Sequence, residues 1–313
     1  MRVLIAEFMD EAAVGSLKRR FATTYDAGLV DRRPALLAAL PAAEALIVRN
    51  RVRVDAELLA AAGRLRVVGR LGVGLDNIDL PACAARGIEV IPATGANALA
   101  VAEYVIGACL VLLRGAYFST AAVAAGDWPR AALSTGCELA GKCFGVVGFG
   151  SIGQRTGRLA RALGMRVIGC DSAIPLTAPL WAEQQTEAHA LPDLLRTADV
   201  VSLHVPLTVA TRHLLGAAEL ALMKPEAILI NTARGGIVDE AAVAQALRAG
   251  RLGGAALDVF EVEPLPRASA LLDCPRLLLT PHVAGLTREA NVRVSTFIAE
   301  QVAAALERGA QAA

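Results

Sequence analysis

The chain has 313 residues, a formal net charge of +1 and a hydrophobic content of 55%, enough for two domains and with no electrostatic basis for binding nucleic acid or an anionic membrane. Acids near the N-terminus argue against a signal peptide, and the apolar run at 105–113 is too short to span a bilayer. The six cysteines have no CxxC spacing, so we expect neither a bound metal nor a disulfide framework, and the expected compartment is a reducing cytoplasm.

Strands alternate with helices over the first part of the chain. The strands are expected at 2–7, 44–48, 65–69 and 88–91, with helices from Asp10 and at 55–62 and 81–86. This alternation predicts a parallel sheet covered on both faces. The turn Gly72-Val73-Gly74 follows the third strand, at the carboxyl edge where open α/β sheets bind ligands.

A long apolar helix is expected at 97–114, and we interpret it as the crossover into a second domain. The segment 117–141 that follows is more mixed in character and contains Trp128. It precedes the next strand, so we expect it to lie on the surface or on a partner.

The stretch 143–171 has the strongest pattern in the chain. An apolar strand at 144–147 is followed by Gly148, Gly150 and Gly153, a helix at 155–163, a strand at 166–170 and then Asp171. Such glycines allow a tight turn, close approach of the backbone to a pyrophosphate and close packing of helix on strand, while the helix N-terminus faces the phosphates. An acid at the end of the second strand favours NAD over NADP because it repels a 2′-phosphate. The alternative for Asp171 is a simple turn residue.

Further strands are expected at 200–203, 227–230, 254–257 and 277–279, with helices at 191–196, 217–223 and 240–249 between them. The pattern predicts a doubly wound sheet of about six or seven parallel strands. A last helix at 290–308 is expected to pack back on the first unit. The expected domains are therefore a substrate domain at 1–97 plus 287–313 and an NAD-binding domain at 98–286.

Candidates for chemistry follow these strands. His282 is a candidate acid or base and Arg234 a candidate carboxylate anchor, because a guanidinium can hold a carboxylate by two parallel hydrogen bonds. A carboxylate bonded to His282 would fix its tautomer and favour its protonated form. Glu261 and Glu263 are equal candidates for that carboxylate on physical grounds. The alternatives are a loop histidine, a solvated arginine and surface carboxylates.

Four motifs in order resemble one family. GFGSIG, INTARGGIVDE, ALDVFEVEP and TPHVAG are similar to the D-isomer-specific 2-hydroxyacid dehydrogenases, and RLGVGLDNID and WPRAALSTGCELAGK resemble the phosphoglycerate-dehydrogenase branch. The resemblance implies an α/β fold with two doubly wound parallel-sheet domains, a Rossmann NAD-binding domain inserted in a flavodoxin-like substrate domain. It also implies a homodimer, with Trp128 in an arm that reaches across the dimer.

The resemblance assigns roles to particular residues. The catalytic residues would be Arg234, which binds the substrate carboxylate, His282 as acid/base, and Glu263 paired with His282, since the family places that acid just before a proline. The residues near the substrate would be Arg49, Val73, Gly74 and Asn97. The cofactor-binding residues would be Gly148, Gly150, Ser151, Ile152, Gly153, Asp171, His204, Pro206, Thr211, Thr232, Ala233, Asp258 and Ala284.

The resemblance implies an NAD-dependent oxidoreductase that interconverts a short D-2-hydroxy acid and its 2-keto acid, with a 3-phosphoglycerate-like substrate favoured. Hydroxypyruvate, glyoxylate and sulfolactate-type acids are the alternatives, and a dinucleotide-sensing corepressor is the alternative of another class. Three departures bear on the substrate. Ser151 stands where relatives commonly have arginine, Asn50 stands where they often have serine, and the chain ends at Ala313 without room for a regulatory domain.

Overall fold

The computed structural model describes residues 1–311 and divides the chain into two compact units, which are residues 1–97 with 286–313 and residues 98–285. Each unit contains one parallel sheet. The predicted fold class is confirmed.

The first unit has a five-stranded sheet in the order β2-β1-β3-β4-β5, the flavodoxin-like order. Its strands are β1 (Arg2–Ile5), β2 (Ala22–Tyr25), β3 (Ala45–Val48), β4 (Val67–Arg70) and β5 (Glu89–Pro92). Its helices are α1 (Glu11–Arg20), η1 (Ala27–Asp31), α2 (Arg33–Ala39), η2 (Leu40–Ala42), α3 (Ala56–Ala61), α4 (Leu80–Ala85) and α13 (Arg288–Gln311). Strand β2 and helix α2 were not predicted from the sequence.

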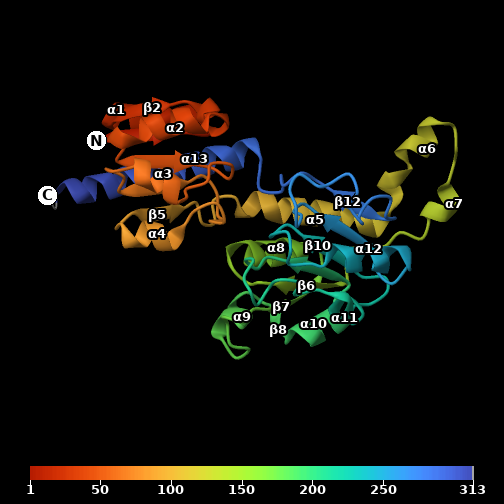
Figure 1. Ribbon diagram of the computed structural model, residues 1–313. Helices are drawn as coiled ribbons and strands as arrows, with labels where there is room; N and C mark the ends of the chain where they lie inside the picture. Colours follow the sequence, from red (N-terminus) through yellow and green to blue (C-terminus); the bar gives the residue numbers. More distant parts are fainter. Residues whose placement is uncertain (312–313) are drawn as a thin grey trace. The chain divides into compact units, whose positions relative to one another are not determined.

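Helices cover both faces of this sheet. One core combines residues of α1 and α13 with β1 and β4, and the other combines α2, α3 and α4 with the opposite face. The C-terminal helix, drawn in blue, lies among the red and orange elements of the N-terminal unit (Figure 1). Gly69 of β4 permits this packing, because a Cβ atom there would lie 2.7 Å from a Val302 methyl group and 2.8 Å from an Ile298 methyl group.

The second unit has a seven-stranded sheet in the order β12-β11-β10-β9-β6-β7-β8, which contains the Rossmann order with one further strand. Its strands are β6 (Cys143–Val147), β7 (Arg166–Cys170), β8 (Glu187–Ala188), β9 (Val200–Leu203), β10 (Ile228–Asn231), β11 (Gly254–Leu257) and β12 (Leu277–Leu279). Its helices are α5 (Ala98–Arg114), η3 (Ala116–Ser119), α6 (Thr120–Ala124), α7 (Arg130–Leu133), α8 (Ser151–Ala162), α9 (Pro179–Glu183), α10 (Leu191–Thr197), α11 (Ala217–Leu220) and α12 (Glu240–Arg248).

The strand order reverses between β6 and β9, which are neighbours in the sheet although β7 and β8 separate them in the chain. In such sheets the crevice at the carboxyl ends of the two diverging strands is the usual ligand site. Helices α10, α11 and α12 cover one face, and α5, α8 and α9 cover the other. Helices α6 and α7 project from the end of α5 (Figure 1).

Among residues 1–311, no single helix is long and apolar enough to cross a bilayer, and only the bent pair Ala98–Arg114 and Ala116–Ala124, at 68° to each other, passes by length and composition.

Candidate active site

The glycine turn follows β6 at the point where the strand order reverses. Gly148 has φ +93°, and a Cβ atom there would lie 2.7 Å from the carbonyl carbon of His204. A Cβ atom at Gly153 would lie 2.1 Å from the carbonyl oxygen of Gly148, so the third glycine lets α8 pack against the turn. Gly150 has no atom within 4 Å of such a position, so the turn is open there. Ser151 and Ile152 form the first turn of α8, which has no side-chain cap, and its N–H groups therefore suit an anion.

Asp171 lies directly after β7 and shapes the same turn. Its Oδ2 accepts a hydrogen bond from the backbone N–H of Phe149 at 2.7 Å, and its Oδ1 accepts one from Ala173 N–H at 2.9 Å. Each carboxylate oxygen has a second lone pair, which leaves acceptor capacity for two ribose hydroxyls. The sequence suggested a ligand contact or a turn residue for Asp171, and the geometry allows both.

The loop after β9 carries the next cofactor candidates. His204 donates its backbone N–H to the carbonyl oxygen of Val147 at 2.7 Å, and its Nε2 lies 3.0 Å from Ser202 Oγ. Burial lowers the pKa of His204 to about 4, so its imidazole is neutral at pH 7. Thr211 Oγ1 donates to the carbonyl oxygen of Pro206 at 2.6 Å, which closes this loop on itself.

Asn231, the last residue of β10, fixes the loop that carries Arg234. Its side chain is 2% exposed; it accepts a hydrogen bond from Ala233 N–H at 3.0 Å and donates one to the carbonyl oxygen of Arg234 at 2.9 Å. Within the described residues, the buried Thr232 Oγ1 has no hydrogen-bond partner. A buried hydroxyl without a partner is costly, so this atom fits a ligand that supplies one. Together with the open glycine turn, it shows that these residues fit a bound dinucleotide.

Gly235 brings the Arg234 loop against the loop that follows β11. A Cβ atom at Gly235 would lie 1.8 Å from the carbonyl oxygen of Phe260 and 2.7 Å from the backbone nitrogen of Glu261. Only glycine permits backbones to approach this closely. The two loops that carry Arg234 and Glu263 are therefore in direct contact.

Glu263 connects that loop to His282. Its Oε1 accepts a hydrogen bond from Phe260 N–H at 3.1 Å, and its Oε2 lies 2.9 Å from His282 Nδ1. Glu261, the other candidate, lies 2.9 Å from Nε2 of a different histidine, His213. The structure thus distinguishes two carboxylates that physical reasoning on the sequence left equivalent.

Asp258 fixes the backbone around His282. Its carboxylate is 1% exposed and accepts hydrogen bonds from Thr280 Oγ1 at 2.6 Å and from the N–H groups of Val283 and Ala284 at 2.8 Å. Its carbonyl oxygen accepts the N–H of His282 at 2.8 Å. His282 has φ +56°, a conformation that non-glycine residues rarely adopt and that functional sites often contain. The carboxylate of Asp258, predicted to contact the cofactor, is therefore bonded to the loop that carries His282 and Ala284.

The predicted substrate-binding residues lie in the first unit, at the carboxyl ends of its strands. Arg49 follows β3, Val73 and Gly74 follow β4, and Asn97 follows β5. Asn77 joins two of these loops, because its amide donates to the carbonyl oxygens of Arg49 at 3.1 Å and Val52 at 2.6 Å. Within residues 1–311, Asn97 Oδ1 is buried and has no hydrogen-bond partner, as expected of an atom that meets a ligand.

Sequence reasoning did not single out the side chains that hold these loops. They are Glu7, Asn77, Asn231 and Thr280. Each is a polar residue at or after the carboxyl end of a strand. That placement was the one available signal, since most buried polar groups in proteins are hydrogen-bonded.

A doubly wound sheet that combines an open glycine turn, an acid directly after the next strand and a histidine paired with a glutamate is typical of an NAD-linked dehydrogenase. The NAD binding domain of the D-isomer specific 2-hydroxyacid dehydrogenases matches residues 106–284. The chain belongs to this family and is an NAD-dependent oxidoreductase that acts on the CH–OH group of 2-hydroxy acids.

Three relatives show how far the similarity extends. An (S)-sulfolactate dehydrogenase of Chromohalobacter salexigens is 54% identical over 97% of this chain and 98% of that protein. A D-3-phosphoglycerate dehydrogenase of Methanocaldococcus jannaschii is 38% identical over 96% of this chain, which spans 57% of that protein's length. The crystal structure of the TT0316 protein from Thermus thermophilus matches with a TM-score of 0.88 and 36% identity, over 98% of this chain and 97% of that one.

Proposed function

We propose that the protein interconverts (S)-sulfolactate and sulfopyruvate with NAD. The relative named for sulfolactate is 54% identical to this chain, whereas the phosphoglycerate relative is 38% identical. This moves the preference from the 3-phosphoglycerate-like acid that the sequence favoured to one of its alternatives. The stereochemistry agrees with a D-specific family. Sulfur ranks the sulfomethyl group above the carboxylate, so the S descriptor in sulfolactate denotes the same arrangement as D in lactate.

The hydrogen bond between Glu263 and His282 at 2.9 Å carries the chemical part of the proposal. Because Glu263 occupies the Nδ1 side of the ring, Nε2 is left for the substrate oxygen. In the reducing direction His282 donates a proton to the forming alkoxide, and in the oxidising direction it accepts the hydroxyl proton. Glu263 fixes the tautomer and stabilises the imidazolium. Bound NAD supplies or accepts the hydride at C2.

Arg234 anchors the C1 carboxylate by paired hydrogen bonds. Its position is set by the Asn231 and Gly235 contacts, so the guanidinium is carried on a rigid loop. The backbone N–H groups of Val73 and Gly74 and the side chain of Asn97 contribute further contacts to the acid. Arg49 binds the anionic group on C3, which is the sulfonate in this proposal.

Steady-state oxidation of NADH by a panel of 2-keto acids tests the substrate. The panel contains sulfopyruvate, phosphohydroxypyruvate, hydroxypyruvate, glyoxylate and pyruvate. We expect the highest kcat/KM for sulfopyruvate. Sulfopyruvate and phosphohydroxypyruvate both carry an anionic group on C3, so their relative kcat/KM decides between them. A higher kcat/KM for phosphohydroxypyruvate would refute sulfolactate and return the assignment to the 3-phosphoglycerate-like acid.

We also propose that the enzyme is a homodimer joined through the segment 115–138. Tyr117 and Trp128 are 64% and 77% exposed, and large apolar residues exposed along one segment are typical of an interface. Light scattering on the purified protein should give twice the mass of one chain. Trp128→Asp should shift it toward the monomer, and a wild-type monomer would refute the proposal.

A further inference from the structure

Among residues 1–311, Arg49 is a half-buried cation that forms no salt bridge. Burial lowers the pKa of its guanidinium, and the charge of Glu7 partly offsets this effect. In the part of the chain that the structure describes, no carboxylate forms a salt bridge with it. Its Nη2 instead donates to the amide oxygen of Asn291 at 2.6 Å. A cation held away from water without a counter-ion is costly, so the site favours an anionic ligand.

The charge of Glu7 acts on Arg49 only from a distance, because the Glu7 carboxylate is bonded to the backbone and not to the guanidinium. It is 4% exposed. Its Oε1 accepts the N–H groups of Arg49 at 2.7 Å and Val52 at 2.9 Å, and its Oε2 faces Arg51 N–H at 3.4 Å. Glu7 thus fixes the loop, and its charge offsets the burial of the Arg49 guanidinium only in part.

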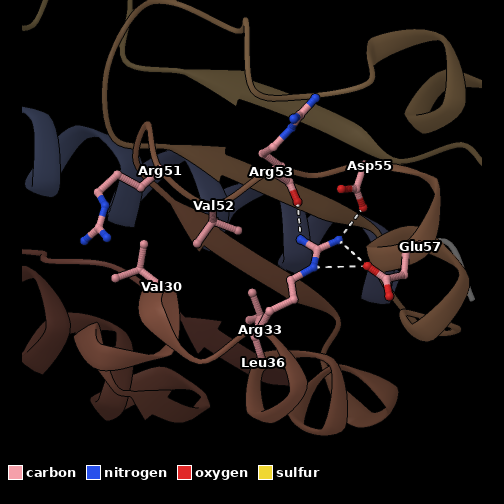
Figure 2. Close-up of a pocket in the computed structure, with 8 residues that line it drawn as sticks. All are labelled: Val30, Arg33, Leu36, Arg51, Val52, Arg53, Asp55 and Glu57. Atoms are coloured by element: carbon pink, nitrogen blue, oxygen red, sulfur yellow. Dashed lines mark hydrogen bonds and ion pairs between the residues drawn. The ribbon is translucent and has the colours of Figure 1, made fainter. Parts of the chain in front are cut away.

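The same loop is held from its other side. Figure 2 shows Arg33 bonded to the carbonyl oxygen of Arg53 and paired with Asp55 and Glu57, beside a pocket of about 250 Å³. The guanidinium groups of Arg51 and Arg53 point away from Arg33 (Figure 2), so the pocket has no convergent cationic site. Arg33 therefore holds the loop through the Arg53 carbonyl oxygen, and Glu7 holds it through the N–H groups of Arg49 and Val52.

Phe8 supplies the remaining contact. The Cζ atom of Arg49 lies 5.7 Å from the centroid of the Phe8 ring, within the range of a cation–π interaction. Phe8 follows β1 and is 53% exposed. A phenyl ring can pack on a guanidinium without accepting any of its N–H groups. Apart from the Nη2 hydrogen bond to Asn291, the N–H groups therefore stay available to a ligand.

We propose that Phe8 is a specificity-determining residue, which together with Asn291 orients the Arg49 guanidinium for the anionic substituent on C3 of the substrate. This inference rests on the proposed function, in which Arg49 binds that group. Phe8 lowers the cost of ordering the guanidinium when the substrate arrives. Phe8 raises the preference of the enzyme for acids with an anionic group on C3 over acids without one. It takes no part in proton transfer.

Three variants test the inference, with Phe8→Leu to remove the ring, Phe8→Tyr to keep it, and Arg49→Ala as the reference. The measured quantity is the ratio of kcat/KM for sulfopyruvate to kcat/KM for hydroxypyruvate, which carries a hydroxyl in place of the sulfonate. We expect Phe8→Leu to lower the ratio about 5-fold, through KM, as for the loss of an interaction of about 1 kcal/mol. Phe8→Tyr should keep it, and Arg49→Ala should lower it further.

The outcomes separate the two proposals. If Arg49→Ala leaves the ratio unchanged, the proposed role of Arg49 is wrong. If Arg49→Ala lowers the ratio and Phe8→Leu does not, only the role of Phe8 is refuted. An equal loss for both substrates in Phe8→Leu, or a loss in Phe8→Tyr as large as in Phe8→Leu, would also refute it, because either result indicates a general effect on the fold.

Discussion

The pairing of Glu263 with His282 can be tested by a substitution that changes one atom. In Glu263→Gln the side chain keeps its shape but one carboxylate oxygen becomes an NH₂ group. The native carboxylate accepts from Phe260 N–H with one oxygen and faces His282 Nδ1 with the other. The amide can satisfy one of these partners, and its NH₂ group must then face the other.

The size of the effect follows from that geometry. Loss of one charge-assisted hydrogen bond costs about 1.5–3 kcal/mol. If the cost falls on the transition state, in which His282 exchanges a proton, kcat should decrease about 10- to 150-fold. Because His282 does not bind the nucleotide in our proposal, the KM for NADH should change little. The assay is the initial rate of NADH oxidation by sulfopyruvate.

The chain supplies a matched control two residues away. Glu261 lies 2.9 Å from Nε2 of His213, the same distance that separates Glu263 from His282. Glu261→Gln therefore makes the same chemical change to a similar pair in the same loop. We expect it to retain at least about half of kcat, as surface substitutions usually do. A variant Glu263→Gln with wild-type turnover, or a Glu261→Gln that loses as much, would refute the assignment.

Three further predictions follow from single contacts. Gly235→Ala would place a Cβ atom 1.8 Å from the Phe260 carbonyl oxygen. We therefore expect the free energy of unfolding to fall by about 1–3 kcal/mol and kcat/KM to decrease by up to about 100-fold. Wild-type stability and activity in this variant would show that the two loops can move apart freely. Burial lowers the pKa of His204 from 6.5 to about 4, so the unfolded chain binds a proton that the folded chain excludes between these values. The free energy of unfolding should therefore fall by about 3 kcal/mol as the pH decreases from about 6.5 to about 4. Denaturant titrations at several pH values should show a smaller fall for His204→Gln than for the wild type. Asp171→Asn removes the charge that repels a 2′-phosphate, and the ratio of kcat/KM for NADH over NADPH should fall about tenfold, an effect of about 1.4 kcal/mol; an unchanged ratio would mean that another residue selects the cofactor.

The sequence by itself determined the fold class and the positions of most strands. Strands 200–203, 254–257 and 277–279 were predicted with the bounds that β9, β11 and β12 have, because each is a nearly continuous apolar run that ends at a turn. Strand β2 was missed for the same reason. It lies at the edge of its sheet with exposed and partly exposed residues in alternation, so its short sequence, ATTY, has no apolar run to detect.

Only the tertiary structure decided which side chains meet. Glu263 and His282 are 19 positions apart and belong to loops after different strands, so their contact depends on the paths of both loops. No local pattern encodes those paths. Asp258 illustrates the same point, since the family resemblance placed it at the cofactor, and only the fold shows that its carboxylate also accepts from Thr280, Val283 and Ala284. Local composition specifies burial and turns, whereas the partner of a buried polar group is set by whichever donors the folded chain brings within about 3 Å.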